Sequence, residues 1–222
     1  MAAGGDVVVV MARYPTPGAV KTRLARAIGA SHACDLYAAF LRDLALRLRS
    51  DAWSLVWAVD PPRADLTEVV GAGSRQIAQR GRDLAARMRH CFDDLFAGGA
   101  RRVVMLGADA PHVGPDVVGT AFAALSLDDA VFVPTRDGGY CLIGLCAAHD
   151  LFSGVSMGGA EVFAQTEGLL GALGLRWSAL ASTFDIDELD DLHRLDALVG
   201  SGAVDLPHTA AALRAWQRSA GR

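Results

Sequence analysis

The sequence has no long apolar run, no paired cysteines and no strongly basic stretch, and each absence argues against a class of protein. Its apolar runs fall short of the roughly 18 residues of a membrane-spanning helix, and its first residues lack the basic flank of a secretory signal. The four cysteines show neither Cys-x-x-Cys pairs nor zinc-finger spacing, so we expect reduced thiols, with a catalytic thiol as the minor alternative. The net charge of −4 argues against a nucleic-acid partner. We therefore expect a cytoplasmic protein that binds neither membrane nor nucleic acid.

What the sequence does contain is a regular alternation of short apolar runs and helix-like stretches. Apolar residues make up 52% of the 222 residues, enough for one sizeable core. Strands are predicted at residues 7–11, 53–59, 74–79, 103–106, 130–134, 140–146 and 176–180, and helices at 31–48, 83–96, 115–125, 160–173, 188–199 and 209–218. This order predicts an α/β fold, a single three-layer α/β/α domain over residues 1–222 with its core at about 7–200 and a mostly parallel sheet. An antiparallel hairpin is expected around Asp137-Gly138-Gly139, and Ser31 is expected to cap the first helix in the series.

One acidic residue is expected at the edge of the sheet where ligands bind. The four apolar residues from Val103 to Leu106 indicate a strand buried on both faces, after which Gly107 and Pro111 turn the chain. Asp109 therefore lies at the carboxyl end of a central strand, which is the ligand-binding edge of open α/β sheets. The alternative is that Asp109 only caps the helix that begins near Gly114.

The loop after the first strand concentrates positive charge. Arg13, Lys21 and Arg23 surround a Pro-Gly turn at Gly18, and a helix is predicted to begin near Lys21. Any one of these cations is more simply a solvated surface side chain, but three beside a helix start favour phosphate binding. Lys21 is expected to be exposed in the free protein. Neither an ordinary P-loop NTPase nor a dinucleotide dehydrogenase is supported, because the contiguous Gly-Lys-Thr and the Gly-x-Gly-x-x-Gly are both missing.

A second acidic cluster lies between residues 184 and 192. Asp185 and Asp187 fall on the same face of an extended segment. Together with Asp109 across the sheet edge, they would supply the carboxylate oxygens that Mg²⁺ prefers. Asp190 and Asp191 fall in the first turn of the next helix, where helix-terminal electrostatics explains their charge.

Five motifs, in this order, give the sequence a resemblance to a known group of proteins. They are ARYPTPGAVKTRL (residues 12–24), QRGRDLAARM (79–88), GADAP (107–111), PTRDGGYCLIGL (134–145) and FDIDELDDL (184–192). On these residues the chain resembles the nucleotide-diphospho-sugar transferase superfamily, which has a GT-A-like fold. Within it, the chain resembles the bacterial glycosyltransferase-like family related to molybdenum-cofactor and phospholactate nucleotidyltransferases. The resemblance covers about residues 7–200.

The resemblance implies roles for the charged residues singled out above. Lys21 and Arg23 match positions that hold the phosphates of a nucleotide or donor, with Arg13 and Gly18 in the same loop. Asp109 matches the metal-binding acid of the central strand. The second metal-binding acid is matched by Asp187 or by its neighbour Asp185, so the implied catalytic residues are Lys21, Asp109 and Asp187, and the implied cofactor is Mg²⁺ or Mn²⁺.

The acceptor side is less well matched. Asp137, Gly138 and Gly139 match the turn that borders the acceptor. The family usually has Trp-Ser-Thr where this chain has Met157-Gly158-Gly159, and Gly-Asp-Leu-Gly where it has Arg82-Asp83-Leu84-Ala85. Asp83 is thus kept as an implied nucleotide-side residue, while glycines near the base or sugar are lost.

The sequence therefore predicts a metal-dependent transferase that uses a nucleoside triphosphate or a nucleotide sugar on a small-molecule acceptor. Nucleotidyl transfer and glycosyl transfer stay open as alternatives, and so does the oligomeric state, with a homodimer as one option. A further alternative, from another class, is a non-catalytic nucleotide-binding or regulatory protein that retains the fold.

Overall fold

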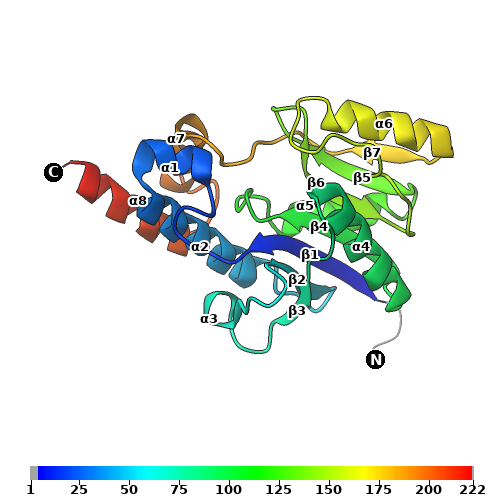
Figure 1. The fold of residues 1–222 in the computed structure, drawn as a ribbon, viewed down its shortest axis with the longest axis horizontal. Helices are drawn as coiled ribbons and strands as arrows, with labels where there is room; N and C mark the ends of the chain where they lie inside the picture. The colour runs from blue at the N-terminus through cyan, green and yellow to red at the C-terminus, as the bar shows by residue number, and fades with distance from the viewer. Residues whose placement is uncertain (1–4, 222) are drawn as a thin grey trace.

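A computed structural model describes residues 5–221, which form one seven-stranded sheet with helices on both faces (Figure 1). The strands are β1 (Asp6–Arg13), β2 (Ser54–Asp60), β3 (Arg75–Ala78), β4 (Arg102–Gly107), β5 (Ala130–Pro134), β6 (Tyr140–Leu145) and β7 (Trp177–Ala179). The helices are α1 (Thr22–Ile28), α2 (Ala30–Arg47), α3 (Thr67–Val70), α4 (Leu84–Ala97), α5 (Pro115–Ala124), α6 (Val162–Leu173), α7 (Leu189–Gly200) and α8 (Pro207–Ala220). Among the described residues, no helix combines the length and apolar character that crossing a bilayer requires.

The sheet is parallel except for one strand. The strand order is β3-β2-β1-β4-β6-β5-β7, and only β6 runs antiparallel to its neighbours β4 and β5. The predicted hairpin across Asp137-Gly138-Gly139 is the β5–β6 connection, which confirms that expectation. Because β6 is reversed, its first residues lie at the same edge of the sheet as the carboxyl ends of β1 and β4.

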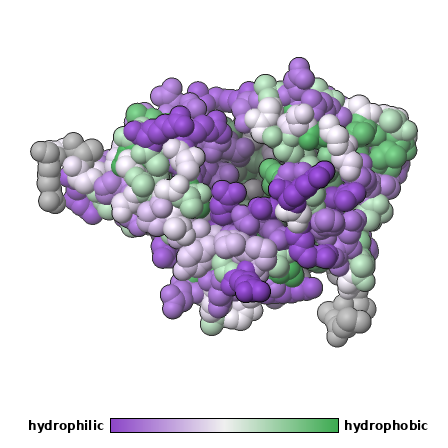
Figure 2. Space-filling model, in the orientation of Figure 1, coloured by the Kyte–Doolittle hydropathy of each residue, from purple (hydrophilic) through white to green (hydrophobic). Residues whose placement is uncertain are grey.

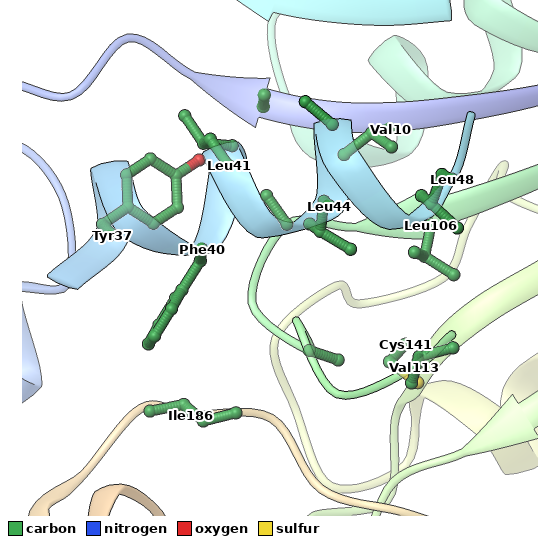
Figure 3. Packing of buried hydrophobic residues seen from close by; sticks show 14 of the residues in the cluster. Val10, Tyr37, Phe40, Leu41, Leu44, Leu48, Leu106, Val113, Cys141 and Ile186 are labelled. Atoms are coloured by element: carbon green, nitrogen blue, oxygen red, sulfur yellow. The ribbon is translucent and has the colours of Figure 1, made fainter. Parts of the chain in front are cut away.

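Two apolar cores lie on the two faces of the sheet. In β1, Val8 and Val10 pack into the core beneath α2 and α5, whereas Val7 and Val9 pack into the core beneath α4 and α6. Figure 3 shows Val10 in one cluster with Leu44 of α2. This alternation is the strand period of two, and each fully buried side chain of this size contributes roughly 1.5–3 kcal/mol to folding.

The last two helices pack beside α1 and α2 rather than over the sheet (Figure 1). Asp43 of α2 is fully buried, and its two carboxylate oxygens accept hydrogen bonds from the backbone N–H groups of His208 (3.0 Å) and Thr209 (2.8 Å). These are among the first N–H groups of α8, which have no partner within the helix. A side chain 165 residues away in sequence therefore caps α8.

One local prediction, and the capping alternative for Asp109, are wrong. Ser31 does not cap α2, because the helix already begins at Ala30 and Gly29 (φ 87°) is the N-cap residue, ending α1 and starting α2 within one position. Asp109 does not cap α5 either, since the N-cap residue is Gly114. The short helix α3 was not anticipated.

Candidate active site

A cavity of about 640 Å³ opens at the carboxyl edge of β1 and β4. It is lined by residues from the ends of these strands, the loop that leads into α1, the start of α4, the start of β6 and the segment before α7. Figure 2 shows the face hollowed between the part that carries α1 and α7 and the part that carries β5 to β7, with hydrophilic residues around the hollow. The cavity lies where ligands bind in sheets of this kind.

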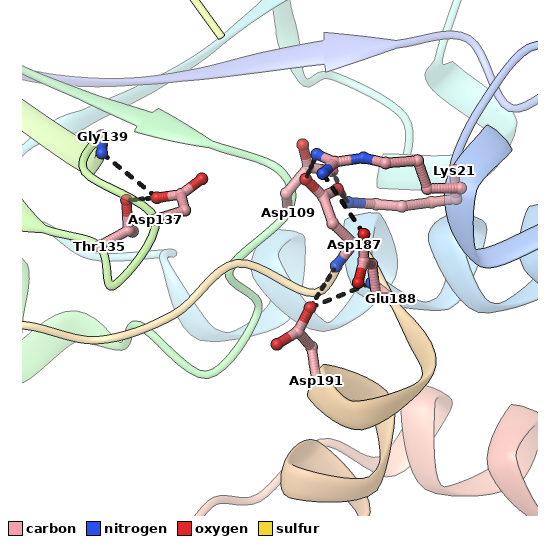
Figure 4. A network of polar contacts seen from close by, with 9 residues as sticks. Lys21, Asp109, Thr135, Asp137, Gly139, Asp187, Glu188 and Asp191 are labelled. Atoms are coloured by element: carbon pink, nitrogen blue, oxygen red, sulfur yellow. Dashed lines mark hydrogen bonds and ion pairs between the residues drawn. The ribbon is translucent and has the colours of Figure 1, made fainter. Parts of the chain in front are cut away.

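Lys21 is the centre of the charged wall of this cavity, and it is the only lysine in the sequence. Its Nζ contacts Asp109 and Asp187 (Figure 4), at 2.5 Å from Asp109 Oδ1 and 3.1 Å from Asp187 Oδ1. Its side chain is only 3% exposed. The two carboxylates hold the pKa of the ammonium above its ordinary value despite its burial. The expectation that Lys21 is exposed in the free protein is therefore wrong, because the acids of two other segments close over it.

The carboxylates of Asp109 and Asp187 converge as predicted. Both lie in contact with one ammonium group, so the contacting oxygens are no more than about 5.6 Å apart, the sum of the two contact distances. The backbone N–H of Ile186 donates to the carbonyl oxygen of Asp109 at 3.0 Å, which ties the two acidic segments together. Arg23 forms a further ion pair with Asp187 from the outer side.

A second contact between the two acidic segments is made by His112. Its Nε2 lies 2.7 Å from Thr183 Oγ1, and its ring stacks on Phe184 with a centroid distance of 4.5 Å. Burial, together with the charge of Arg47, lowers the pKa of His112 to about 4, so the ring is neutral at physiological pH. A neutral, stacked histidine fixes the spacing of the segments without adding charge beside the acids.

Asp185 is the acid without a partner. Its Oδ1 is buried and has no hydrogen-bond partner among the described residues. Burial raises the pKa of Asp185 to about 7, and the negative charge of Asp109 adds to the effect. A buried carboxylate oxygen that has no hydrogen-bond partner and lies near a second carboxylate is a suitable ligand for Mg²⁺ or Mn²⁺, because these cations prefer oxygen ligands. In residues 5–221, however, no three acidic, histidine or cysteine side chains are grouped as a ready metal cluster, and Lys21 occupies the position between Asp109 and Asp187.

Arg13 and Asp83, both predicted on the nucleotide side, also line the cavity. Arg13 pairs with Asp60 at the end of β2, with Nε 3.2 Å from the carboxylate oxygen. Asp83 is the N-cap of α4, where its Oδ1 accepts the backbone N–H of Ala86 at 2.8 Å. These contacts give each side chain a structural function and hold it at the rim of the cavity.

Four predicted residues do not line this cavity: Gly18, Asp137, Gly138 and Gly139. Asp137 stabilises its own turn instead, because Oδ1 accepts hydrogen bonds from Thr135 Oγ1 (2.6 Å) and from the N–H of Gly139 (3.2 Å). Gly138 has φ +88°, and a Cβ there would lie 1.9 Å from the carbonyl oxygen of Ala160. The turn thus packs against the segment before α6, and the structure gives these residues a role in shaping that segment.

Little in the sequence marks Tyr37 and Gln79 as residues of the cavity wall, and a third wall residue, Asp60, was not anticipated. Tyr37 lies among the apolar residues of α2, yet its hydroxyl oxygen accepts a hydrogen bond from the backbone N–H of Arg13 at 2.9 Å. Gln79 is buried, and its Nε2 donates to the carbonyl oxygens of Ala12 (3.1 Å) and Ala58 (2.8 Å). Asp60 carried the same signal as Asp109, an acid at the carboxyl end of an apolar strand.

A second cavity, of about 900 Å³, adjoins the first at the start of α4. The two cavities share Arg82, Asp83 and Leu84, and the second is also lined by Arg89 and by the segment that includes Met157. This is the segment in which the chain departs from the Trp-Ser-Thr pattern.

Comparison with known proteins is consistent with this geometry. Residues 43–159 match the model of a family described as "Uncharacterized protein conserved in bacteria (DUF2064)". A phosphoenolpyruvate guanylyltransferase of Geodermatophilus obscurus is 32% identical over 188 residues, which are 84% of this chain and 82% of that protein. A crystal structure from Desulfovibrio desulfuricans G20, described as a candidate nucleotide-diphospho-sugar transferase, is 32% identical with a TM-score of 0.89, over 97% of this chain and 98% of the other. A CMP:2-keto-3-deoxy-manno-octonic acid synthetase complexed with CTP shares the fold at 15% identity and a TM-score of 0.56, over 90% of this chain and all of the other.

Proposed function

This chain belongs to the DUF2064 family of bacterial proteins, within the nucleotide-diphospho-sugar transferase superfamily, and from that premise we propose that it is a nucleotidyltransferase. The donor is a nucleoside triphosphate, and the acceptor is a small anionic molecule. The observation that carries the proposal is the convergence of Asp109, Asp187 and Lys21 at the carboxyl edge of the sheet. The relative named as a guanylyltransferase favours nucleotidyl over glycosyl transfer.

The phosphate side of the proposed site consists of side chains rather than of a helix terminus. Helix α1 has only seven residues, so its dipole adds little, and Lys21 and Arg23 supply the positive charge. Both cations already contact carboxylates, which keeps them in place before any ligand arrives. Preorganised charge of this kind is what phosphoryl-type chemistry requires from a protein, because it depends on positioning and electrostatic stabilisation.

The acids fit a divalent cation. Asp109 has a side chain 44% exposed toward the cavity, and Asp185 has an unpartnered buried oxygen, so these two residues, with Asp187 beside them, would hold Mg²⁺ or Mn²⁺. When bound, the cation neutralises negative charge on the phosphates and on the leaving pyrophosphate. Asp187 stays paired with Arg23 and helps to place that guanidinium at the cavity.

The base side of the proposed site lies near Gln79. Both hydrogens of its amide nitrogen are engaged by backbone carbonyls, so Oε1 is the atom free to accept a hydrogen bond. Leu84 and Met88 supply apolar surface on the same cavity wall. A fixed acceptor beside apolar surface suits a nucleobase that presents an N–H group.

Calorimetric titration of GTP, CTP, ATP and UTP, with Mg²⁺ and with EDTA, tests the binding step. We expect one of these nucleotides to bind only with Mg²⁺, and Asp109→Asn to abolish that binding. Asp94→Asn is a matched control, because Asp94 is 46% exposed, is paired with Arg80 and lies outside both cavities. Equal loss in both variants, or binding that persists in Asp109→Asn, would contradict the proposal.

The reaction type is tested by the leaving group. Incubation with the bound nucleotide and phosphoenolpyruvate should release pyrophosphate and form a nucleotidylated acceptor. Glycosyl transfer is the second candidate, favoured by the description of the Desulfovibrio relative, and it would instead release a nucleoside diphosphate from a nucleotide sugar. Tight nucleotide binding with neither product in a panel of phosphorylated acceptors would favour a non-catalytic, nucleotide-binding protein.

A further inference from the structure

Lys21 occupies a position that a bound cation would otherwise take. Its ammonium lies between one oxygen of Asp109 and one of Asp187, at 2.5 and 3.1 Å, and is almost fully buried. All 20 other residues of the Lys and Arg total are arginines. An ammonium is a compact charge with three donors, whereas a guanidinium is a planar fork, so only the lysine can sit as a point charge between two carboxylates.

The ion pair is also placed so that it can open. Lys21 has a left-handed backbone (φ 49°, ψ 43°) directly before α1, and its side chain crosses from that loop to the acids. A flexible four-carbon stem lets the ammonium move by side-chain rotation while α1 and the sheet stay in place. Asp109 is the more exposed partner, so the cavity side of the contact is where a ligand would arrive.

We propose that Lys21 is an internal counter-ion. Its ammonium prevents a free divalent cation from binding between Asp109 and Asp187, and nucleotide phosphates attract it away from these acids. This inference rests on the proposed nucleotide site. When the ammonium leaves the two carboxylates, their negative charge favours the binding of another cation at that position. Phosphate oxygens are negatively charged, as the carboxylates are, so they offer the ammonium an alternative partner. Metal and nucleotide therefore bind as a coupled pair, each weakly without the other.

A lysine that only binds phosphates and a lysine that is also an internal counter-ion predict different effects of its removal on the affinity for the metal. If Lys21 only contacts phosphates, then its removal weakens nucleotide binding and leaves the affinity for the metal alone unchanged. If Lys21 is also the internal counter-ion, then its removal has opposite effects on the two affinities. If Lys21 is merely structural, then its removal lowers the stability of the protein and tightens the binding of neither metal nor nucleotide.

The first test measures Mn²⁺ binding without nucleotide, from the electron paramagnetic resonance signal of free Mn²⁺. We expect Lys21→Met to bind Mn²⁺ at least tenfold more tightly than the parent. Arg102→Met is the matched control, because it removes a cation from Asp6 at the opposite edge of the sheet, and its Mn²⁺ affinity should stay at the parental value. An unchanged or weaker Mn²⁺ affinity in Lys21→Met, or an equal gain in Arg102→Met, overturns the inference.

The second test uses the parent protein, so it does not depend on the folding of a variant. Because Lys21 is the only lysine, ¹³Cε-lysine labelling gives a single side-chain NMR signal. We expect 1 mM Mg²⁺ alone to leave this signal in place, and Mg²⁺ with the nucleotide that binds in the calorimetric titration to shift it. A shift with Mg²⁺ alone refutes the inference. If GTP, CTP, ATP and UTP all fail to bind, the proposed function fails, while the Mn²⁺ comparison still decides whether Lys21 keeps a free cation from the acids.

Discussion

Replacement of Asp185 by asparagine should make the protein more stable at pH 8 and hardly change it at pH 4. In the folded chain, burial and the charge of Asp109 raise the pKa of Asp185 to about 7, from an ordinary value of 3.8. Between these values the folded state keeps a proton that the unfolded state has released. The free energy of unfolding therefore falls as the pH rises through this window, and it levels off once both states are ionised.

The size of the effect follows from the width of that window. One proton held differently in the two states changes the free energy of unfolding by about 1.4 kcal/mol per pH unit. About three pH units give a ceiling of about 4 kcal/mol. Asp185 titrates together with its acidic neighbours, which spreads the effect, so we expect a gain of roughly 2–3 kcal/mol for Asp185→Asn at pH 8. The amide keeps the shape of the carboxyl group and cannot ionise.

Urea unfolding in EDTA, at half-unit steps from pH 4 to 8, measures this difference. The stability of the parent should decline across the range relative to that of Asp185→Asn, and the two curves should meet near pH 4. Asp190→Asn is the control, because Asp190 is exposed in the first turn of α7. If Asp185→Asn loses stability at pH 8, then its carboxylate is held by a stabilising partner, and the reasoning from an orphaned buried oxygen is wrong.

Three other outcomes are expected. Gly138→Ala should lower the melting temperature in a thermal scan by the equivalent of more than about 1 kcal/mol, because the added Cβ would lie 1.9 Å from the carbonyl oxygen of Ala160. Gly154→Ala is the control and should cost less, because Gly154 has a similar positive φ and its Cβ would meet nothing within 4 Å. Asp43→Ala should destabilise by about 1–2 kcal/mol in urea unfolding, through loss of the cap on α8. Gel shifts with duplex DNA or RNA at physiological salt should show no complex, because the net charge is −4.

The sequence sufficed for those features that depend on local pattern. The apolar run before Asp109 placed that acid at the carboxyl end of a central strand, and the Asp-Gly-Gly turn marked the one antiparallel hairpin. The extent of the domain, the cytoplasmic location and the oligomeric state stay predictions. The family resemblance, rather than periodicity, brought Lys21 and Asp187 into one site.

The features that escaped prediction depend on contacts between distant segments. The burial of Lys21 arises from acids 88 and 166 residues further along the chain, and no local pattern encodes it. From the sequence alone, repulsion between Asp109 and the acids near it predicts that Asp109→Asn folds at least as stably as the parent without metal. With Lys21 between the acids, we expect this variant to lose stability instead, because a buried ammonium is left with one carboxylate fewer.

The Lys21–Asp187 ion pair joins residues 166 positions apart, and Asp109 comes from between them. Contacts of such long range require a large loop to close, so we expect them to form late in folding. The charged centre needs the loop after the first strand, the end of the central strand and the segment before α7 to be in place together. A chain cut between α6 and α7 would keep most of its strands and lack the covalent connection that brings Asp187 to Lys21.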